Sequence, residues 1–329
     1  MRMPAEWEPH EATWLAWPHE TTDWPGKFAA IPWVYGEIAR HLSRFERVRI
    51  LIENGAGEKK ARRVLQKCGA NLGRIDFFHC PTDRSWTRDY CPLFVRDRSE
   101  LIASNWIFNG WAKYDNHHLD NAVPEFVAEQ LSMPRIDTGV VLEGGSIDVN
   151  GAGALLTTEE CLLSPIQARN PHLDRDQLEQ VFATQLGATQ IVWLKQGIAG
   201  DDTHGHVDDI ARFVNERTIV AAVEDDESEL NHGPLQENLN LLRQTSFQIA
   251  TLPMPAPVYF DGQRLPASYA NFYIANGLVL VPTFNDPKDR VALNTLAGLF
   301  PDREVAGIAS TDLVLGLGTL HCMTQQQPA

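Results

Sequence analysis

The chain has 329 residues, of which 43% are hydrophobic and 22% are charged, as in ordinary soluble globular proteins. Its 28 basic and 43 acidic residues give a net charge of −15, which argues against a nucleic-acid partner, because such binding needs a basic surface. No apolar run suits a membrane span, and the N-terminus lacks a signal-peptide pattern. The five scattered cysteines fit neither a disulfide framework nor a paired zinc motif, so we expect a cytoplasmic protein.

Four segments are typical of β-hairpins, because β-forming residues flank a turn rich in Asn, Asp or Gly. They span residues 93–102, 146–156, 211–220 and 271–281. Helical hydrophobic periodicity predicts helices over residues 28–44, 57–68, 120–132, 174–185, 228–245 and 288–299. A strand–turn–strand–helix unit that returns about every 50–65 residues indicates a repeat architecture.

The two chain ends supply the parts of a fifth unit. We expect a strand over residues 10–17 to pair with one over residues 318–324, which would close the repeats into a ring without open sheet edges. No linker or low-complexity segment divides the chain. The sequence therefore predicts the α/β fold class and a single domain, residues 1–329, of about five ββαβ-type repeats.

Three polar clusters each lie just before a hairpin, so a ring of repeats would direct them toward one axis. They contain Trp86 and Asp89, then Glu143 and Gly144, then the run from Asp202 to Asp208. In the third cluster, His206 and Asp208 are two residues apart, and on a strand this spacing places both side chains on one face. Such a pair can transfer protons and hold a cation.

Each of these residues also has a structural explanation. A histidine is often a satisfied structural residue, Asp89 could cap a helix or join an ion pair, and Glu143 could begin a bent strand. Cys322, near the C-terminus, could be a small buried hydrophobe. These explanations account poorly for a thiol, a histidine and two carboxylates that all lie at repeat boundaries.

One chemistry uses all four groups. A guanidinium is planar and carries several N–H donors, so Asp89 and Asp208 could bind its two edges. The Cys322 thiolate could then attack the central carbon, favoured by the positive charge of the bound group. His206 would protonate the departing ammonia and then deprotonate the hydrolytic water. This reaction needs no metal and no organic cofactor.

The motifs around these residues resemble those of the agmatine deiminase family, which is grouped with bacterial-type peptidylarginine deiminases. The resemblance covers residues 3–327 and rests on the segments Trp86-Thr87-Arg88-Asp89-Tyr90, Leu142-Glu143-Gly144-Gly145-Ser146, Asp202 to Asp208 and Leu320 to Gln326. It implies a pentein fold, a five-bladed pseudo-symmetric α/β propeller, and hydrolysis of agmatine to N-carbamoylputrescine and ammonia. The chain departs from the family pattern at His204 and Asp148.

By the same resemblance, Cys322 matches the nucleophile, His206 the acid/base, and Asp89 with Asp208 the guanidinium-binding pair. Asp202 matches a further acidic position of the site. We add three candidate substrate-binding residues from their chemistry: Glu143, Gly144, whose backbone could approach a ligand closely, and Trp86, which could pack on the substrate's methylenes or in the core.

Several alternatives stay open from the sequence. The same chemistry could act on free or peptidyl arginine or on a methylated arginine. A zinc hydrolase could use His204, His206 and Asp208 as ligands. The repeat ring could also be a non-catalytic binding protein. The expected partner is a cationic guanidino compound, with no nucleic acid and no membrane, and a homodimer or a higher homo-oligomer stays open as the assembly.

Overall fold

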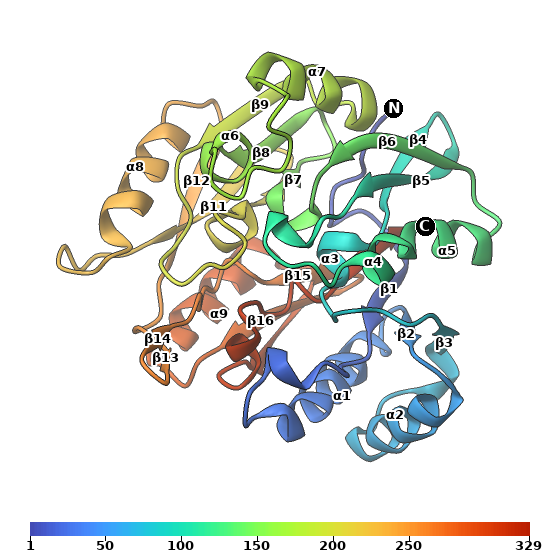
Figure 1. The fold of residues 1–329 in the computed structure, drawn as a ribbon. Coiled ribbons are helices and arrows are strands. Elements are labelled where there is room, and N and C mark those ends of the chain that lie inside the picture. Colours follow the sequence, from blue (N-terminus) through green and yellow to red (C-terminus); the bar gives the residue numbers. More distant parts are fainter.

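Five sheets of three or four strands form the fold, and Figure 1 shows them following one another around the molecule in chain order. The computed structural model describes residues 1–329. The first sheet has the order β18–β1–β2–β3, with β1 (His10–Ala16), β2 (Arg47–Ile52), β3 (Ile75–His79) and β18 (Gln325–Pro328). The other strands are β4 (Leu93–Asp97), β5 (Glu100–Ile107), β6 (Arg135–Val141), β7 (Asp148–Val149), β8 (Ala154–Thr158), β9 (Gln190–Leu194), β10 (Ala211–Asn215), β11 (Thr218–Val223), β12 (Gln248–Pro253), β13 (Tyr259–Phe260), β14 (Gln263–Arg264), β15 (Tyr273–Ala275), β16 (Leu278–Thr283) and β17 (Glu304–Ala309).

Each three-stranded sheet repeats one pattern. Two strands form an antiparallel hairpin, and the second strand pairs in parallel with a third strand that the chain reaches through a helix, as in β4, β5 and β6. The four hairpins predicted from the sequence are confirmed, because β4–β5, β7–β8, β10–β11 and β15–β16 all pair antiparallel. Strands β13 and β14 form a separate two-stranded hairpin.

The helices are α1 (Ile31–Leu42), α2 (Gly55–Cys68), α3 (Thr87–Tyr90), α4 (His118–Asn121), α5 (Val123–Gln130), α6 (Glu159–Leu163), α7 (Arg175–Leu186), α8 (His232–Leu242) and α9 (Lys288–Leu299). The predicted helices are confirmed, although the helix predicted over 120–132 is divided at Ala122, before the proline in the first turn of α5. Local capping explains sharp ends, as in α7, which begins with an Asp174 capping box and ends at Gly187 with φ +72°. No helix is both long enough and apolar enough to cross a membrane.

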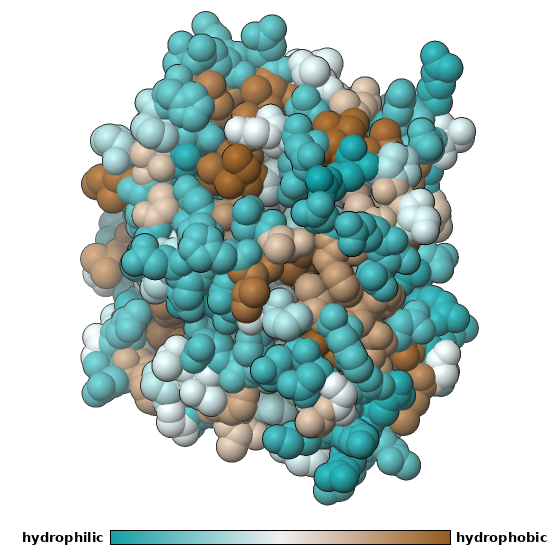
Figure 2. All heavy atoms as spheres, turned by 45° about the vertical axis from the view of Figure 1, so that its right-hand side comes forward, coloured by the Kyte–Doolittle hydropathy of each residue, from teal (hydrophilic) through white to brown (hydrophobic).

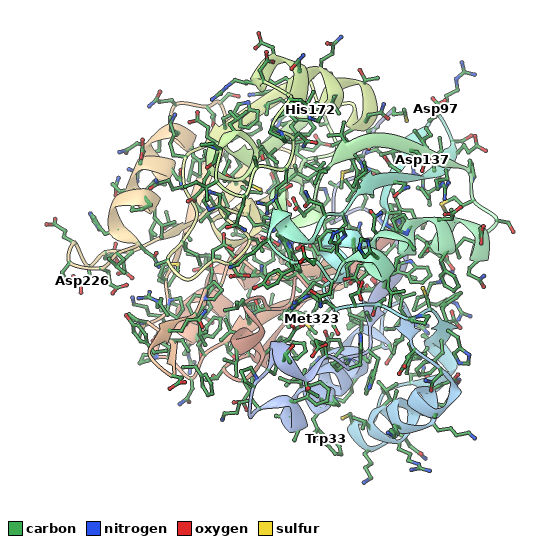
Figure 3. The ribbon with its side chains drawn as sticks, viewed as in Figure 1. Trp33, Asp97, Asp137, His172, Asp226 and Met323 are labelled. Carbon is green, nitrogen blue, oxygen red and sulfur yellow. The ribbon has the colours of Figure 1, made fainter.

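The two chain ends meet in one sheet, as the sequence predicts, but through a different C-terminal strand. Strand β18 pairs antiparallel with β1 and consists of Gln325–Pro328, so the strand predicted over 318–324 is wrong. Residue Leu317 adopts φ +69°, and the Asn271 side chain accepts hydrogen bonds from Thr319 Oγ1 and His321 N, which fold the segment into a turn. Figure 3 shows the neighbouring Met323 in the middle of the molecule, with Trp33 and Asp226 at its rim.

A buried apolar core holds the sheets and the C-terminal turn together. The largest cluster contains 48 buried residues, including Trp14, Tyr273, Cys322 and Met323, so both chain ends contribute to it. Hydrophilic residues cover most of the face in Figure 2, between scattered apolar patches. The turn that carries Cys322 is therefore packed in the interior instead of frayed at the surface.

Candidate active site

A pocket of about 430 Å³ opens at the centre of the fold. Four of the residues predicted from the sequence line it: Trp86, Asp89, Asp202 and Cys322. Trp86 also packs against Trp24, with ring centroids 5.4 Å apart, so it serves both the core and the pocket wall. The size suits a small elongated ligand.

Gly145 is the point on which three predicted site residues converge. A Cβ atom at this position would lie 2.6 Å from His206 Nδ1, 2.9 Å from Asp89 Oδ1 and 3.0 Å from Asp208 Oδ2. Any other residue would therefore push the three groups apart. Their positions come from α3 for Asp89 and from the short helix Val207–Asp209 for Asp208, so the prediction that His206 and Asp208 share a strand face is wrong.

Asp89 lies at the pocket floor with both oxygens bonded. Gly145 N donates to Oδ1 at 3.0 Å, and Trp111 Nε1 donates to Oδ2 at 2.9 Å. Burial raises the pKa of Asp89 to about 6, although the nearby His206 favours the carboxylate. A bound cation would therefore stabilise the Asp89 carboxylate, because it would compensate for the hydration that burial removes.

Asp208 is held from behind by a buried chain of polar groups. His321 Nδ1 lies 2.7 Å from Asp208 Oδ2, and His321 Nε2 lies 2.8 Å from Glu6 Oε2. Burial opposes the charge of Asp208, but the hydrogen bond with His321 holds its pKa below the ordinary value. Its second oxygen, Oδ1, is buried without a hydrogen-bond partner, and Asp208 lies behind the residues that line the pocket.

Glu6 connects this series of hydrogen-bonded groups to two arginines. Arg88 and Arg212 each lie 3.0 Å from its carboxylate, and Ile274 N donates to it at 2.8 Å. Burial works against ionisation, yet Arg212, followed by His321 and Arg88, holds the pKa of Glu6 well below its ordinary range. The N-terminal segment thereby fixes the position of Asp208 from the far side of the site.

The Cys322 thiol is buried at the pocket floor and surrounded by polar groups. Asn271 Nδ2 donates to its sulfur at 3.1 Å, and Asp208 Oδ2 lies 3.8 Å away. The turn is tied to α3, because Arg88 N donates to Cys322 O at 3.1 Å. Burial, and then the carboxylates of Asp208 and Asp209, raise the pKa of Cys322 well above its ordinary value. These effects favour the neutral thiol over the thiolate when no ligand is bound.

His206 lies between two carboxylates. Its Nδ1 is 3.8 Å from Asp89 Oδ1, and its Nε2 is 3.9 Å from Glu143 Oε2. Burial disfavours the charged ring, but Asp89, Cys161 and Asp208 together outweigh this effect and raise the pKa of His206 well above its ordinary value. A protonated imidazolium beside the pocket floor can act as a general acid.

Glu143 and Gly144 lie behind the pocket and are absent from its lining. Glu143 Oε1 accepts a hydrogen bond from Arg169 Nε at 2.9 Å, in an ion pair that is fully buried. A Cβ atom at Gly144 would lie 2.2 Å from Arg88 O, so this glycine allows close packing against α3. The two residues thus support the groups in front of them.

Acidic residues neutralise the cationic side chains near the pocket mouth. Lys113 and Tyr114 both donate to the Asp202 carboxylate, and Arg84 donates to Asp23. Asp23 and Asp202 line the pocket, whereas Lys113 does not. The Asp23 Oδ2 atom is buried without a partner. Arg84 also lines the pocket, so a ligand meets the ion pair of Asp23 with Arg84 and the carboxylate of Asp202.

The two positions that depart from the family pattern lie away from the pocket. The Asp148 carboxylate is bonded to Arg212 Nε at 2.8 Å and accepts from Phe213 N, so it is part of the buried support. His204 points toward Glu160 and Ser164. The zinc-hydrolase alternative requires His204 to lie with His206 and Asp208, but these three residues do not form a group of potential metal ligands.

Comparison with known proteins identifies the family. The family model for Porphyromonas-type peptidyl-arginine deiminase matches residues 2–328. This chain belongs to that family. It is 37% identical to an agmatine deiminase of Pseudomonas fluorescens, with 99% of this chain and 95% of that relative covered. The structure of a C. jejuni agmatine deiminase, a cysteine-to-serine variant with substrate bound, superimposes with a TM-score of 0.92 at 30% identity, covering 99% and 96% of the two chains. An Enterococcus faecalis agmatine deiminase gives a TM-score of 0.91 at 29% identity, covering 99% and 95%.

Sequence reasoning missed several residues that shape this deiminase-family site. Asn271 contacts the nucleophile candidate but begins a predicted hairpin, where it suggested only a strand start. His321 stands inside the C-terminal motif and Glu6 near the N-terminus, and their contact spans most of the chain and leaves no local signal. Trp111 donates its indole N–H to Asp89, but a tryptophan outside the motifs gives no sequence signal for such a contact.

Proposed function

We propose that this chain hydrolyses agmatine to N-carbamoylputrescine and ammonia through a covalent intermediate on Cys322. The observation that supports this most directly is the grouping of four side chains. Asp89 and Cys322 line the pocket, His206 and Asp208 meet Asp89 around Gly145, and Asp208 lies 3.8 Å from the Cys322 sulfur. The agmatine deiminases among its relatives support the choice of substrate.

The first half-reaction forms the intermediate. Asp89 and the free oxygen of Asp208 bind the edges of the guanidinium and place its central carbon beside Cys322. The cation offsets the carboxylates that disfavour the thiolate, so the thiol releases its proton to solvent as the substrate binds. A C–S bond forms, the terminal C–N bond breaks, and His206 gives its proton to the leaving ammonia.

The second half-reaction releases the product. His206, now neutral, removes a proton from a water molecule, which attacks the amidino carbon. The C–S bond breaks, the carbon keeps one oxygen as the carbonyl of the ureido group, and the hydroxyl proton of that oxygen passes to the departing sulfur, which restores the thiol. Glu143 acts as a positioning residue for His206, since Arg169 fixes the carboxylate that faces Nε2.

The charges around the pocket mouth favour agmatine over arginine. An arginine substrate carries an α-carboxylate, which needs a free cationic partner. Arg84 and Lys113 are both engaged by Asp23 and Asp202, and Arg88 is buried against Glu6 and Gln326. The carboxylates at the mouth suit the terminal amine of agmatine.

A substrate panel tests the proposal. Purified protein is incubated with agmatine, arginine and methylated arginine, and both ammonia and the ureido product are measured. We expect agmatine to give the highest kcat/KM and Cys322→Ser to remove turnover of every substrate. A preference for arginine would refute the assignment of agmatine, and activity in Cys322→Ser would refute the covalent mechanism.

The same proposal covers the finer predictions about architecture and setting. The five sheets and the pairing of β1 with β18 support a closed, five-bladed pentein ring that forms one catalytic domain. The five free cysteines support a reducing, cytoplasmic compartment. A homodimer or higher homo-oligomer stays a prediction from the sequence, to be measured by sedimentation.

A further inference from the structure

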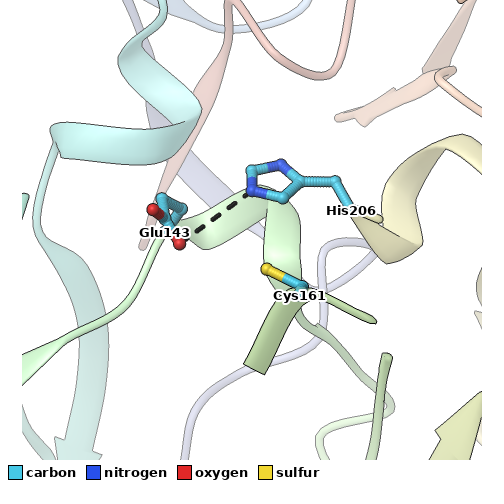
Figure 4. A group of neighbouring side chains, drawn as sticks. All are labelled: Glu143, Cys161 and His206. Atoms are coloured by element: carbon cyan, nitrogen blue, oxygen red, sulfur yellow. Dashed lines mark ion pairs between the residues drawn. The ribbon is translucent and has the colours of Figure 1, made fainter. Parts of the chain in front are cut away.

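Behind the pocket floor, His206 meets two other potential metal ligands. Glu143 precedes a short helical turn, Cys161 lies in α6, and all three side chains are buried (Figure 4). One donor atom from each residue lies within 4.8 Å of the other two. This group differs from the set of His204, His206 and Asp208 considered from the sequence.

The polar atoms of this group are incompletely satisfied. Glu143 Oε2 and both ring nitrogens of His206 are buried without a hydrogen-bond partner. The gap of 3.9 Å between Oε2 and Nε2 is too long for a hydrogen bond. A buried polar group without a partner loses its hydration without compensation, so a ligand that bridges these atoms would stabilise the folded protein.

The donor types select the class of ligand. A thiolate, an imidazole and a carboxylate form a mixed set that suits zinc, whereas magnesium and calcium require more oxygen ligands. Tetrahedral zinc keeps its donors about 3.3–3.8 Å apart, so the three side chains would need to close by about 1 Å. Glu143 can contribute Oε2 while Oε1 keeps its bond to Arg169.

We propose that Glu143, Cys161 and His206 form a zinc-binding site whose occupation inhibits the enzyme. The Cys161 thiol and the protonated His206 ring each release a proton to solvent, and the ring then donates a nitrogen lone pair to zinc, with a water molecule as fourth ligand. A surface pocket of about 640 Å³ lies on the same helix and is lined by Glu160, Glu237 and His204, and by Glu159 with its ion-pair partner Lys195.

The inhibitory effect rests on the proposed function, because it requires His206 as the acid/base. A ring bound to zinc cannot carry the proton that the leaving ammonia needs. Zinc binding itself does not depend on the substrate or the reaction. The two parts of the proposal can therefore be measured separately.

The binding test uses Cys322→Ser, which removes the other thiol of the active site. Zinc is titrated against a chromophoric chelator, and we expect one zinc per chain. Adding Cys161→Ser should weaken the affinity about 100-fold or more, as expected for the loss of a ligand. Adding Cys68→Ser, a partly exposed cysteine elsewhere, is the matched control and should change nothing. Unchanged affinity in the Cys161→Ser protein would overturn the proposal.

Cobalt substitution covers the case in which Cys161→Ser fails to fold. In protein that carries Cys322→Ser and Cys68→Ser, bound cobalt should show a thiolate-to-metal charge-transfer band, and its absence would overturn the site. In separate activity assays, zinc should inhibit the unmodified enzyme and should lose at least about 100-fold in potency against Cys161→Ser. Binding without inhibition would overturn the inhibitory role alone, whereas inactivity toward agmatine without zinc would count against the proposed function.

Discussion

Asp89→Asn offers a sharp test of the electrostatics at the pocket floor, because it converts a buried carboxylate into a neutral group of the same shape. Asp89 is 4% exposed and lies near Asp208 and Glu143, whose charges add to the effect of burial. In the enzyme, the substitution should abolish guanidinium binding. In the free protein, it should remove a charge that the fold accommodates poorly.

The size of the effect follows from the pKa. Burial raises the pKa of Asp89 from 3.8 to about 6, a shift that corresponds to about 3 kcal/mol. The folded state therefore holds this proton more tightly than the unfolded state does. The stabilisation by the neutral acid is complete below about pH 4 and is lost as the pH rises through about 6. Asparagine mimics the neutral acid at every pH.

The assay is denaturant unfolding of the wild type and Asp89→Asn between about pH 4 and pH 8, without substrate, followed by the emission of the nine tryptophans. The stability of the variant relative to the wild type should rise by about 3 kcal/mol between about pH 4 and 7. Asp97→Asn, at an exposed hairpin turn, is the control and should stay within about 0.5 kcal/mol throughout. A relative stability of Asp89→Asn that is independent of pH would refute the reasoning.

Three further predictions concern the thiol, the tail and the N-terminal support. Cys322→Ser should lower kcat at least about 10³-fold while the unfolding midpoint changes little. Deletion of residues 320–329 should abolish activity and also destabilise the fold, since β18 is lost. Equal unfolding midpoints for the two variants would contradict this prediction. Glu6→Gln should destabilise the fold by about 3–5 kcal/mol, because Arg88 and Arg212 lose a buried partner. Glu8→Gln is the control: its ion pair with Arg2 is partly exposed, so the substitution should destabilise the fold by less than about 1 kcal/mol. Where Glu6→Gln stays folded, KM should rise more than kcat falls, as Asp208 loses its support; an unchanged KM would exclude this positioning role.

Local pattern was sufficient for most of the architecture. The hairpins and helices depend on alternation, helical periodicity and turn residues, all of which act over short segments. The strand prediction for residues 318–324 failed because the side chain of Asn271, about 50 residues away, folds this segment into a turn. Its apolar and β-forming residues carry no sign of that contact.

The candidate site shows the same division. Cys322, His206, Asp89 and Asp208 could be selected from residue chemistry and motif position, and the structure brings them together around Gly145. The residues that support these four could not be predicted, because they act through single contacts between distant parts of the chain, such as the contact of Glu6 with His321. These contacts become visible only when the chain ends are placed in space.

The charge distribution of the floor suggests why the substrate must take part in activating the nucleophile. The carboxylates that would bind a guanidinium also raise the pKa of Cys322, after the effect of burial. In the free enzyme, the same groups therefore attract the cation and suppress the thiolate. A bound guanidinium reverses the second effect, because it places a positive charge against the sulfur. Uncharged electrophiles should for this reason react slowly with Cys322, and cationic amidines of similar reactivity should alkylate it faster. Equal rates for the two kinds of reagent would show that the thiolate forms without the substrate.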